Sequence, residues 1–187
     1  MNSPRMIALG LVVGSLGVAV LALAASAGNR ASARERQIER GQYIATIAAC
    51  NDCHTPGFFY GSPDFERRLS GSEVGWVGPW GVTDPRNLTP DPETGIASWS
   101  EQDIVNAVRT GMRPDGSVIL PPMPWPNYST MTDEDAFALA AYLKSLKPVK
   151  HRVPDRVAPG VAFDGAAFRL PAAPAGDAPR GTAEKAH

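Results

Sequence analysis

Two cysteines and one histidine form the clearest chemical pattern in the chain. The segment Cys50-Asn51-Asp52-Cys53-His54 has the spacing C-x-x-C-H and stands where a helical pattern ends. Cysteines three apart at a helix terminus can reach the two vinyl groups on one edge of a porphyrin and form thioethers. His54 then projects toward the ring centre, where its imidazole can bind iron. The motif therefore predicts one covalent haem c, attached to Cys50 and Cys53 and ligated by His54.

Two other interpretations explain fewer residues of the motif. A disulfide or a thioredoxin-like dithiol gives the adjacent His54 no role, and such a dithiol normally lies near a βαβ pattern, which the sequence lacks. A zinc site needs more ligands than the chain offers. There are only two cysteines, and the other histidines are His151 and His187. The sequence favours haem over both alternatives.

A six-coordinate haem needs a second axial ligand, and methionine sulfur is the usual partner for electron transfer. The chain has five methionines, of which Met1 and Met6 belong to an apolar N-terminal segment. Met112 follows a helix-ending glycine, where an apolar residue packs back on its own helix. Met131 precedes the candidate N-cap Thr132, which fits a hydrophobic staple. Four of the five methionines therefore have another explanation.

Met123 is the remaining methionine, and it lies within residues 121–126, with the sequence PPMPWP. Proline restricts the backbone, and a chain ordered before ligation loses less entropy when the weak iron–sulfur bond forms. We predict Met123 as the distal ligand, with Met131 as the second choice and His151 as the third. The alternative for Met123 is a plain hydrophobic side chain in a proline loop.

Residues 1–27 form a leader of one of two kinds. Arg5 precedes a run, Met6 to Ala27, that carries no charge. Ala25-Ser26-Ala27 fits a signal-peptide cleavage site. The run exceeds the usual h-region of about 7–15 residues and matches the ~20 residues that span a bilayer. Both a cleaved signal and a retained membrane anchor place the remainder on the exported side of the membrane.

Three short helices are expected to position these residues. The first runs from Glu35 to about Cys50, and Gly41 within its apolar face indicates a close crossing with another helix. The second begins at the N-cap Ser100 and stops at Gly111, and the third extends over 132–147, before a proline. The prediction is an all-α fold.

Long loops are expected to join these helices. Glycine and proline number 18 each, so long sheets are unfavourable. Residues 55–98 show little periodicity, and a loop of that length is expected to wrap a bound object. Opposite charges nearly balance, at 18 Lys+Arg and 19 Asp+Glu, which excludes a nucleic-acid surface as the main theme. We expect a spacer over 28–34, one domain over 35–150 and an Ala/Pro-rich tail, extended or disordered, over 151–187.

Further motifs place the chain near a known family. They are ERGQYIA before CNDCH, then GPWG, NLTPDPETGIASWS, RTGMRPDG and MPWPNYSTMTDEDAFALAAYL, spread over Glu39 to Lys147. This stretch resembles class I c-type cytochromes, and more narrowly the cytochrome c subunits that partner bacterial membrane-bound dehydrogenases for alcohols, sugar acids and aldehydes. Many relatives carry two or three such modules, whereas this chain has one C-x-x-C-H. The resemblance implies a class I cytochrome c domain, and the single C-x-x-C-H motif implies one haem.

The resemblance also implies a function. We expect a non-enzymatic carrier of single electrons, with a membrane-bound dehydrogenase as donor and a terminal oxidase or another cytochrome as acceptor. A haem-based sensor or a structural haem subunit is the alternative. A haem peroxidase is a weaker one, because a distal Met123 blocks the open site that it needs.

Several other residues have expected roles around the haem. The carbonyl of Pro79 is a candidate acceptor for the His54 Nδ1–H. Asn87 and Arg113 are candidates for the haem propionates, or for surface turns. Four aromatic residues are candidates for the crevice wall or for an ordinary small core: Trp80, Trp99, Trp125 and Tyr128.

Overall fold

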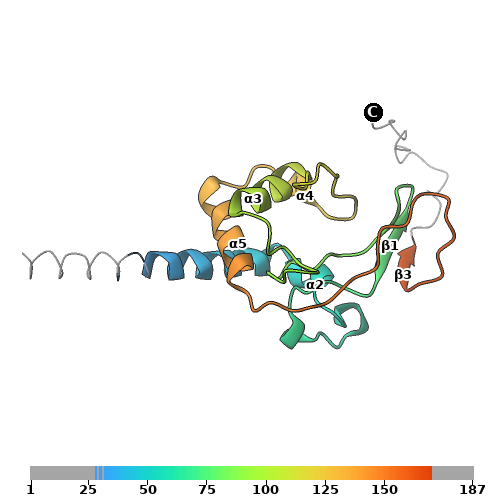
Figure 1. Ribbon diagram of the computed structural model, residues 1–187, viewed down its shortest axis with the longest axis horizontal. Helices are drawn as coiled ribbons and strands as arrows, with labels where there is room; N and C mark the ends of the chain where they lie inside the picture. Colours follow the sequence, from blue (N-terminus) through green and yellow to red (C-terminus); the bar gives the residue numbers. More distant parts are fainter. Residues whose placement is uncertain (1–27, 29, 31, 170–187) are drawn as a thin grey trace, which may run out of the picture.

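The computed structural model describes residues 28, 30 and 32–169 (Figure 1). The predicted leader at 1–27 and the last part of the predicted tail, 170–187, lie outside the described residues. Within the part that is described, none of the helices combines the length and the apolar character needed to span a bilayer.

The first helix runs through residues 32–47, so residues 32–34, assigned by composition to a spacer, are helical as well. An ion pair between Arg34 and Glu101 joins this N-terminal part to the next long helix. The helix ends before Cys50, because Ala49 has a left-handed backbone with φ 55°. The C-x-x-C-H motif then forms a separate helix, α2, over Cys50–His54. The prediction of one helix to residue 50 was therefore too long.

The two later helices are confirmed together with their caps. Helix α3 covers Glu101–Thr110, and Ser100 and Asp103 form the reciprocal capping box. Gly111 ends α3 in the left-handed conformation, at φ 69°. Helix α5 covers Asp133–Ser145, and the side chain of Thr132 accepts a hydrogen bond from the Asp135 amide. Local capping residues thus determine both helix starts.

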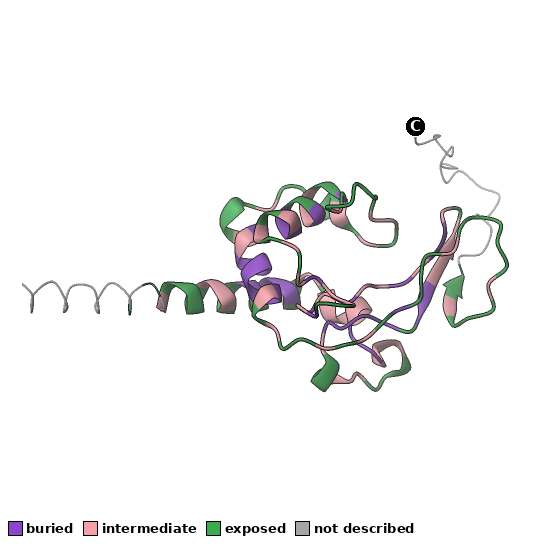
Figure 2. Ribbon diagram, in the orientation of Figure 1, coloured by how far each residue is buried: buried purple, intermediate pink, exposed green. Residues whose placement is uncertain are grey.

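The hydrophobic core lies where the first helix, α3 and α5 meet (Figure 2). Gly41 is the point of closest approach, because a Cβ atom there would stand 1.9 Å from the carbonyl oxygen of Ala138 in α5. This confirms the expected close crossing. The buried members of the core include Ile44, Ala45, Ile104, Val105, Leu139 and Leu143. A short helix, α4 over Trp125–Tyr128, follows the proline loop and was not predicted.

A small sheet departs from the all-α expectation. Strands β1 (Gly75–Gly78), β2 (Gly81–Thr83) and β3 (Ala167–Arg169) are arranged in the order β2-β1-β3. β1 pairs antiparallel with β2 and parallel with β3. Strands of three or four residues are too short to show an alternating pattern, which is why periodicity missed them. Two 3-10 turns, Phe58–Tyr60 and Phe65–Arg67, complete the elements.

Residues 148–169 form an extended segment that we call the C-terminal strap. It leaves α5, passes the loops before α3 and ends in β3 beside β1 (Figure 1). Val157 exchanges backbone hydrogen bonds with Val82, at 2.9 and 3.1 Å. Phe168 of the strap packs against Trp76 and Phe59, with ring centroids 4.7 and 4.9 Å away. A domain boundary at residue 150 stays a prediction.

Candidate cofactor site

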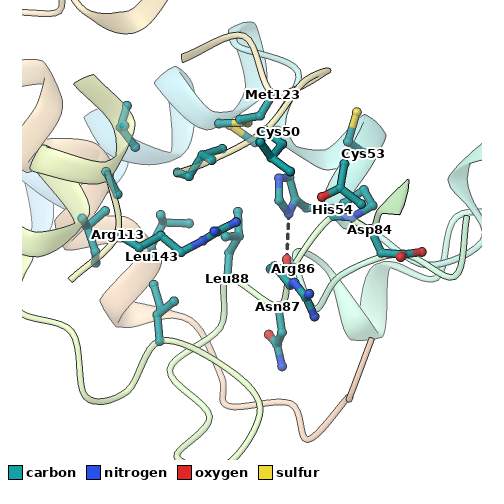
Figure 3. Close-up of a pocket in the computed structure, with 18 of the residues that line it drawn as sticks. Cys50, Cys53, His54, Asp84, Arg86, Asn87, Leu88, Arg113, Met123 and Leu143 are labelled. Carbon is teal, nitrogen blue, oxygen red and sulfur yellow. Dashed lines mark hydrogen bonds between the residues drawn. The ribbon is translucent and has the colours of Figure 1, made fainter. Parts of the chain in front are cut away.

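One cavity of about 820 Å³ lies between α2, α3, α5 and the loops at 83–88 and 119–124. Its size falls in the range of ligand pockets, about 300–1,000 Å³. The four predicted site residues, Cys50, Cys53, His54 and Met123, all line it (Figure 3). Aliphatic side chains make up much of the rest of the wall: Leu88, Ile96, Ile104, Leu139 and Leu143. The site is therefore a mainly apolar pocket with sulfur and imidazole groups on its wall.

A backbone hydrogen bond fixes the ring of His54. Its Nδ1 lies 2.7 Å from the carbonyl oxygen of Arg86 (Figure 3). A carbonyl can only accept, so Nδ1 carries the proton and Nε2 keeps the lone pair that a metal needs. Burial lowers the pKa of His54, and the bond to Arg86 opposes that shift. The prediction of Pro79 as the acceptor was wrong. The chain between Pro79 and Arg86 forms β2, and it brings the carbonyl of Arg86 to the histidine instead.

The two cysteines are free thiols in the structure, and both are half-buried. Burial raises the pKa of Cys50 to about 11, and it also raises the pKa of Cys53. The Tyr128 hydroxyl donates to the carbonyl oxygen of Ala48 at 2.9 Å and so joins the loop after α4 to the turn before α2. Burial thus disfavours the thiolate form of both cysteines, which stand at the cavity wall.

The structure separates the candidate second ligands. Met123 and Met131 both line the cavity, but Met131 also packs against the hydrophobic core. Met112 lies outside that wall, with 45 % of its surface exposed. His151 uses Nδ1 for a hydrogen bond to Ser70, 2.9 Å from its carbonyl oxygen. Met123 is the methionine of the wall that is not packed into the core.

The aromatic predictions hold in part. Trp99 and Tyr128 line the cavity, whereas Trp80 and Trp125 are not among the described residues of its wall. Trp125 instead packs against Gly111, where a Cβ atom would stand 2.5 Å from its ring. Trp76 of β1 does line the cavity and was missed, because only the sheet brings it there.

Three arginines are among the residues that line the cavity: Arg86, Arg113 and Arg156. Burial lowers the pKa of Arg113, and the charges of Arg86 and Arg156 lower it further. The sequence suggested only Arg113. Arg86 lies in a loop and Arg156 in the strap, and no motif near either residue indicates a place at the cavity. The amide of Asn87, the other candidate, is buried and donates to Thr94 Oγ1 at 3.0 Å. Asn87 therefore holds loops together.

Asp84 is an unusual member of the cavity wall. It is 4 % exposed, and neither of its carboxyl oxygens has a hydrogen-bond partner among residues 32–169. Burial raises the pKa of Asp84 above its usual value, and the charge of Arg86 opposes this. The folded state thus binds the proton more tightly than the unfolded chain does. Its contribution to stability is greatest below the unfolded pKa and is lost as pH rises through the raised folded pKa.

We expect Asp84→Asn to raise the free energy of unfolding by about 1 kcal/mol at pH 7, because a buried carboxylate without a partner is removed. The gain should vanish near pH 4 and below, where the parent carboxyl is protonated. Chemical denaturation at both pH values measures this. Asp115→Asn is the matched control, because hydrogen bonds from Ser117 lower the pKa of Asp115. This variant should have a lower free energy of unfolding than the parent at neutral pH, and the difference should shrink at low pH. An equal effect of Asp84→Asn at both pH values would contradict the prediction.

Comparison with known proteins gives a consistent set of relatives. No family model matches the chain. It is 33 % identical over 141 residues to the cytochrome c subunit of a quinone alcohol dehydrogenase from Gluconobacter oxydans, covering 74 % of this chain and 28 % of that protein. It is 35 % identical over 134 residues to the gluconate 2-dehydrogenase cytochrome c subunit of Pantoea cypripedii, covering 72 % and 27 %. The fructose dehydrogenase cytochrome subunit of Gluconobacter japonicus is 36 % identical over 120 residues, covering 64 % and 23 %.

These matches cover most of this chain but only about a quarter of each relative. The similarity therefore concerns one part of a longer protein in each of them.

Proposed function

We propose that this chain, a homologue of the cytochrome c subunits of alcohol, gluconate and fructose dehydrogenases, is a mono-haem c-type cytochrome that carries single electrons. The observation that carries the proposal is the cavity lined by both cysteines of C-x-x-C-H, by His54 and by Met123. A haem bound there supplies a one-electron couple between ferric and ferrous iron. The single C-x-x-C-H in the sequence supports a count of one haem.

The residues of the chain have distinct tasks in this proposal. Cys50 and Cys53 would form the two thioethers to a bound haem, and His54 and Met123 would be its iron ligands. The hydrogen bond to the Arg86 carbonyl keeps His54 Nε2 deprotonated and the ring fixed. Apolar side chains from α3 and α5 exclude water, which raises the reduction potential because the net-positive ferric state is disfavoured in a low dielectric.

The fold supports the same proposal. The first helix, α3 and α5 pack together on one side of the cavity, while long loops and the strap enclose the rest. We assign this arrangement to the class I cytochrome c fold, with a small sheet added to its helices. The chain then acts as a carrier, and catalysis belongs to its partners.

The partners follow from the relatives and from the N-terminal sequence. We propose a membrane-bound dehydrogenase as electron donor and a terminal oxidase or another cytochrome as acceptor. With residues 1–27 as a cleaved signal or as an anchor, the chain lies on the periplasmic side of the bacterial inner membrane. An anchor would raise the effective concentration of the domain beside its donor.

The test uses the full chain, matured with haem in a bacterial host. Intact mass should show one haem per chain, and membranes that contain a substrate-driven dehydrogenase should reduce the protein when substrate is added. Membranes without substrate are the control. A colourless protein, or a haem protein that no such membrane reduces, would overturn the proposal. Rapid binding of carbon monoxide to the ferrous protein would instead favour an open, peroxidase-like site.

Met123→Ala and Met131→Ala form a matched pair that tests the distal ligand. In the ferric protein, a methionine–iron bond gives a weak absorption band in the far red. We expect Met123→Ala to abolish this band and to lower the reduction potential, because a methionine ligand raises it. Met131→Ala should keep the band and lose only packing stability, roughly 2 kcal/mol for a half-buried methionine. Loss of the band in Met131→Ala alone would reassign the ligand.

A further inference from the structure

The loop that presents the Arg86 carbonyl is held on two sides. On the first side lies the segment at 69–72. The Leu88 amide donates to the Leu69 carbonyl oxygen at 2.8 Å, and the Ser72 amide donates to the Pro85 carbonyl oxygen at 3.1 Å. These bonds join two loops that both precede α3.

On the second side lies the C-terminal strap, which contacts the same loop through side chains. Arg86 donates from Nη1 to the carbonyl oxygen of Pro154 at 2.8 Å, and the same nitrogen stands 3.9 Å from a carboxyl oxygen of Asp155. Asn87 donates from Nδ2 to the carbonyl oxygen of Val149 at 2.8 Å. Arg86 therefore contacts both partners: its carbonyl accepts from His54, and its side chain binds the strap.

The strap itself is anchored on both sides of Pro154. Val153 is 5 % exposed and lies so close to Gly71 that a Cβ atom at the glycine would stand 2.6 Å from it. Val157 is paired with Val82 by two backbone hydrogen bonds. The Pro154 carbonyl, which accepts from Arg86, is thus fixed by contacts of Val153 and Val157 that lie outside the cavity.

We propose that the C-terminal strap positions the axial histidine through Arg86. The strap fixes the Arg86 side chain through the Pro154 carbonyl. The fixed side chain restrains the backbone of Arg86, and the carbonyl of Arg86 orients the His54 ring through Nδ1. Arg86 is accordingly a positioning residue for the proposed electron carrier, and this inference rests on His54 being an iron ligand. A hydrogen bond from a cationic donor is stronger than one from a neutral donor. Loss of the bond from Arg86 to the Pro154 carbonyl is therefore expected to make the Arg86 carbonyl more mobile.

Exchange of the His54 Nδ1 proton in the ferrous, haem-loaded protein tests this directly, because the proton is protected only while its acceptor stays in place. Two variants remove the contact between Arg86 and Pro154. Arg86→Ala removes the donor, and a chain that stops after Arg152 removes the acceptor. We expect each to speed exchange of this proton about tenfold or more. The two changes together should have no larger effect than the greater single one, since they remove the same contact. Arg86→Lys, which retains a cation, should restore part of the protection.

Two controls separate positioning from general destabilisation. Arg152→Ala removes an exposed strap arginine that has no hydrogen bond or ion pair with other described residues, and it should leave exchange within twofold of the parent. The backbone amide of Leu143 in α5 reports global opening and should change much less than His54 in every variant. Unchanged His54 exchange in Arg86→Ala, additive effects, or equal acceleration at Leu143 would each overturn the inference.

The same samples distinguish failure of this inference from failure of the proposed function. If the parent protein carries one covalent haem, shows the methionine–iron band and is reduced by substrate-driven membranes, the proposed function stands whatever Arg86 does. If the stopped chain does not fold, Arg86→Ala against Arg152→Ala still decides the role of the arginine.

Discussion

Replacing both Cys50 and Cys53 by alanine is expected to give a colourless chain that does not keep the fold. In the proposed function, a haem without thioethers would not be retained, and nothing would then fill the cavity of about 820 Å³. Several aliphatic side chains of its wall would then face water, and each contributes about 1.5–3 kcal/mol when fully buried. Their sum is comparable with the whole stability of a small domain, about 5–15 kcal/mol. Haem staining of a denaturing gel and far-ultraviolet circular dichroism measure the two losses.

The single variant Cys53→Ala is the matched control for the double variant. It keeps Cys50 for one of the two proposed thioethers and both proposed iron ligands, His54 and Met123. It should therefore stay coloured and helical, with a lower midpoint of thermal unfolding. A double variant that is colourless but has the helix content and cooperative unfolding of the parent would contradict the prediction. It would show that the protein part forms a core without its cofactor.

Gly41→Val is expected to cost about 3 kcal/mol or more of the free energy of unfolding. The first helix crosses α5 at this glycine, and a Cβ atom would stand 1.9 Å from the carbonyl oxygen of Ala138 and 2.7 Å from the Cβ of Tyr142. A backbone oxygen cannot turn aside as a long side chain can, so the helices must separate. Overpacking of this kind costs about 1–3 kcal/mol where the structure can adjust and more where it cannot.

Gly28→Val is the control for this substitution, because Gly28 is also helical and has no described atom within 4 Å of its added Cβ. Its effect should stay within about 0.5 kcal/mol, as for most surface substitutions. Denaturant unfolding of the haem-loaded proteins compares the two. Similar small effects at both positions would mean that the crossing at Gly41 is looser than these distances indicate.

The parts of the fold that the sequence predicted are those set by neighbouring residues. The capping box at Ser100 and Asp103 involves residues three apart, and Gly111 ends its helix through its own backbone freedom. The C-x-x-C-H motif is equally local, so the roles predicted for Cys50 and His54 depend only on adjacent residues. Gly41 was predicted from the cost of glycine inside a helix, which only a close neighbour explains.

The parts that the sequence did not predict depend on distant residues. Trp76 reaches the cavity because β1 pairs with β3, whose residues are about ninety positions later in the chain. Arg86 replaces Pro79 as the partner of His54 because the β1–β2 turn directs the chain past the histidine. Ala49 adopts a left-handed conformation that its residue type does not favour. Each of these features is selected by tertiary contacts and leaves no periodic or compositional signal.

The strap also sets an order of assembly. β3 joins β1, whose residues precede it by about ninety positions, and two other strap residues, Asp155 and Arg156, line the cavity. The strap is therefore the last part of the described cavity wall to be synthesised. Contacts between such remote positions also form slowly. The strap side of the cavity wall is therefore expected to form late in folding.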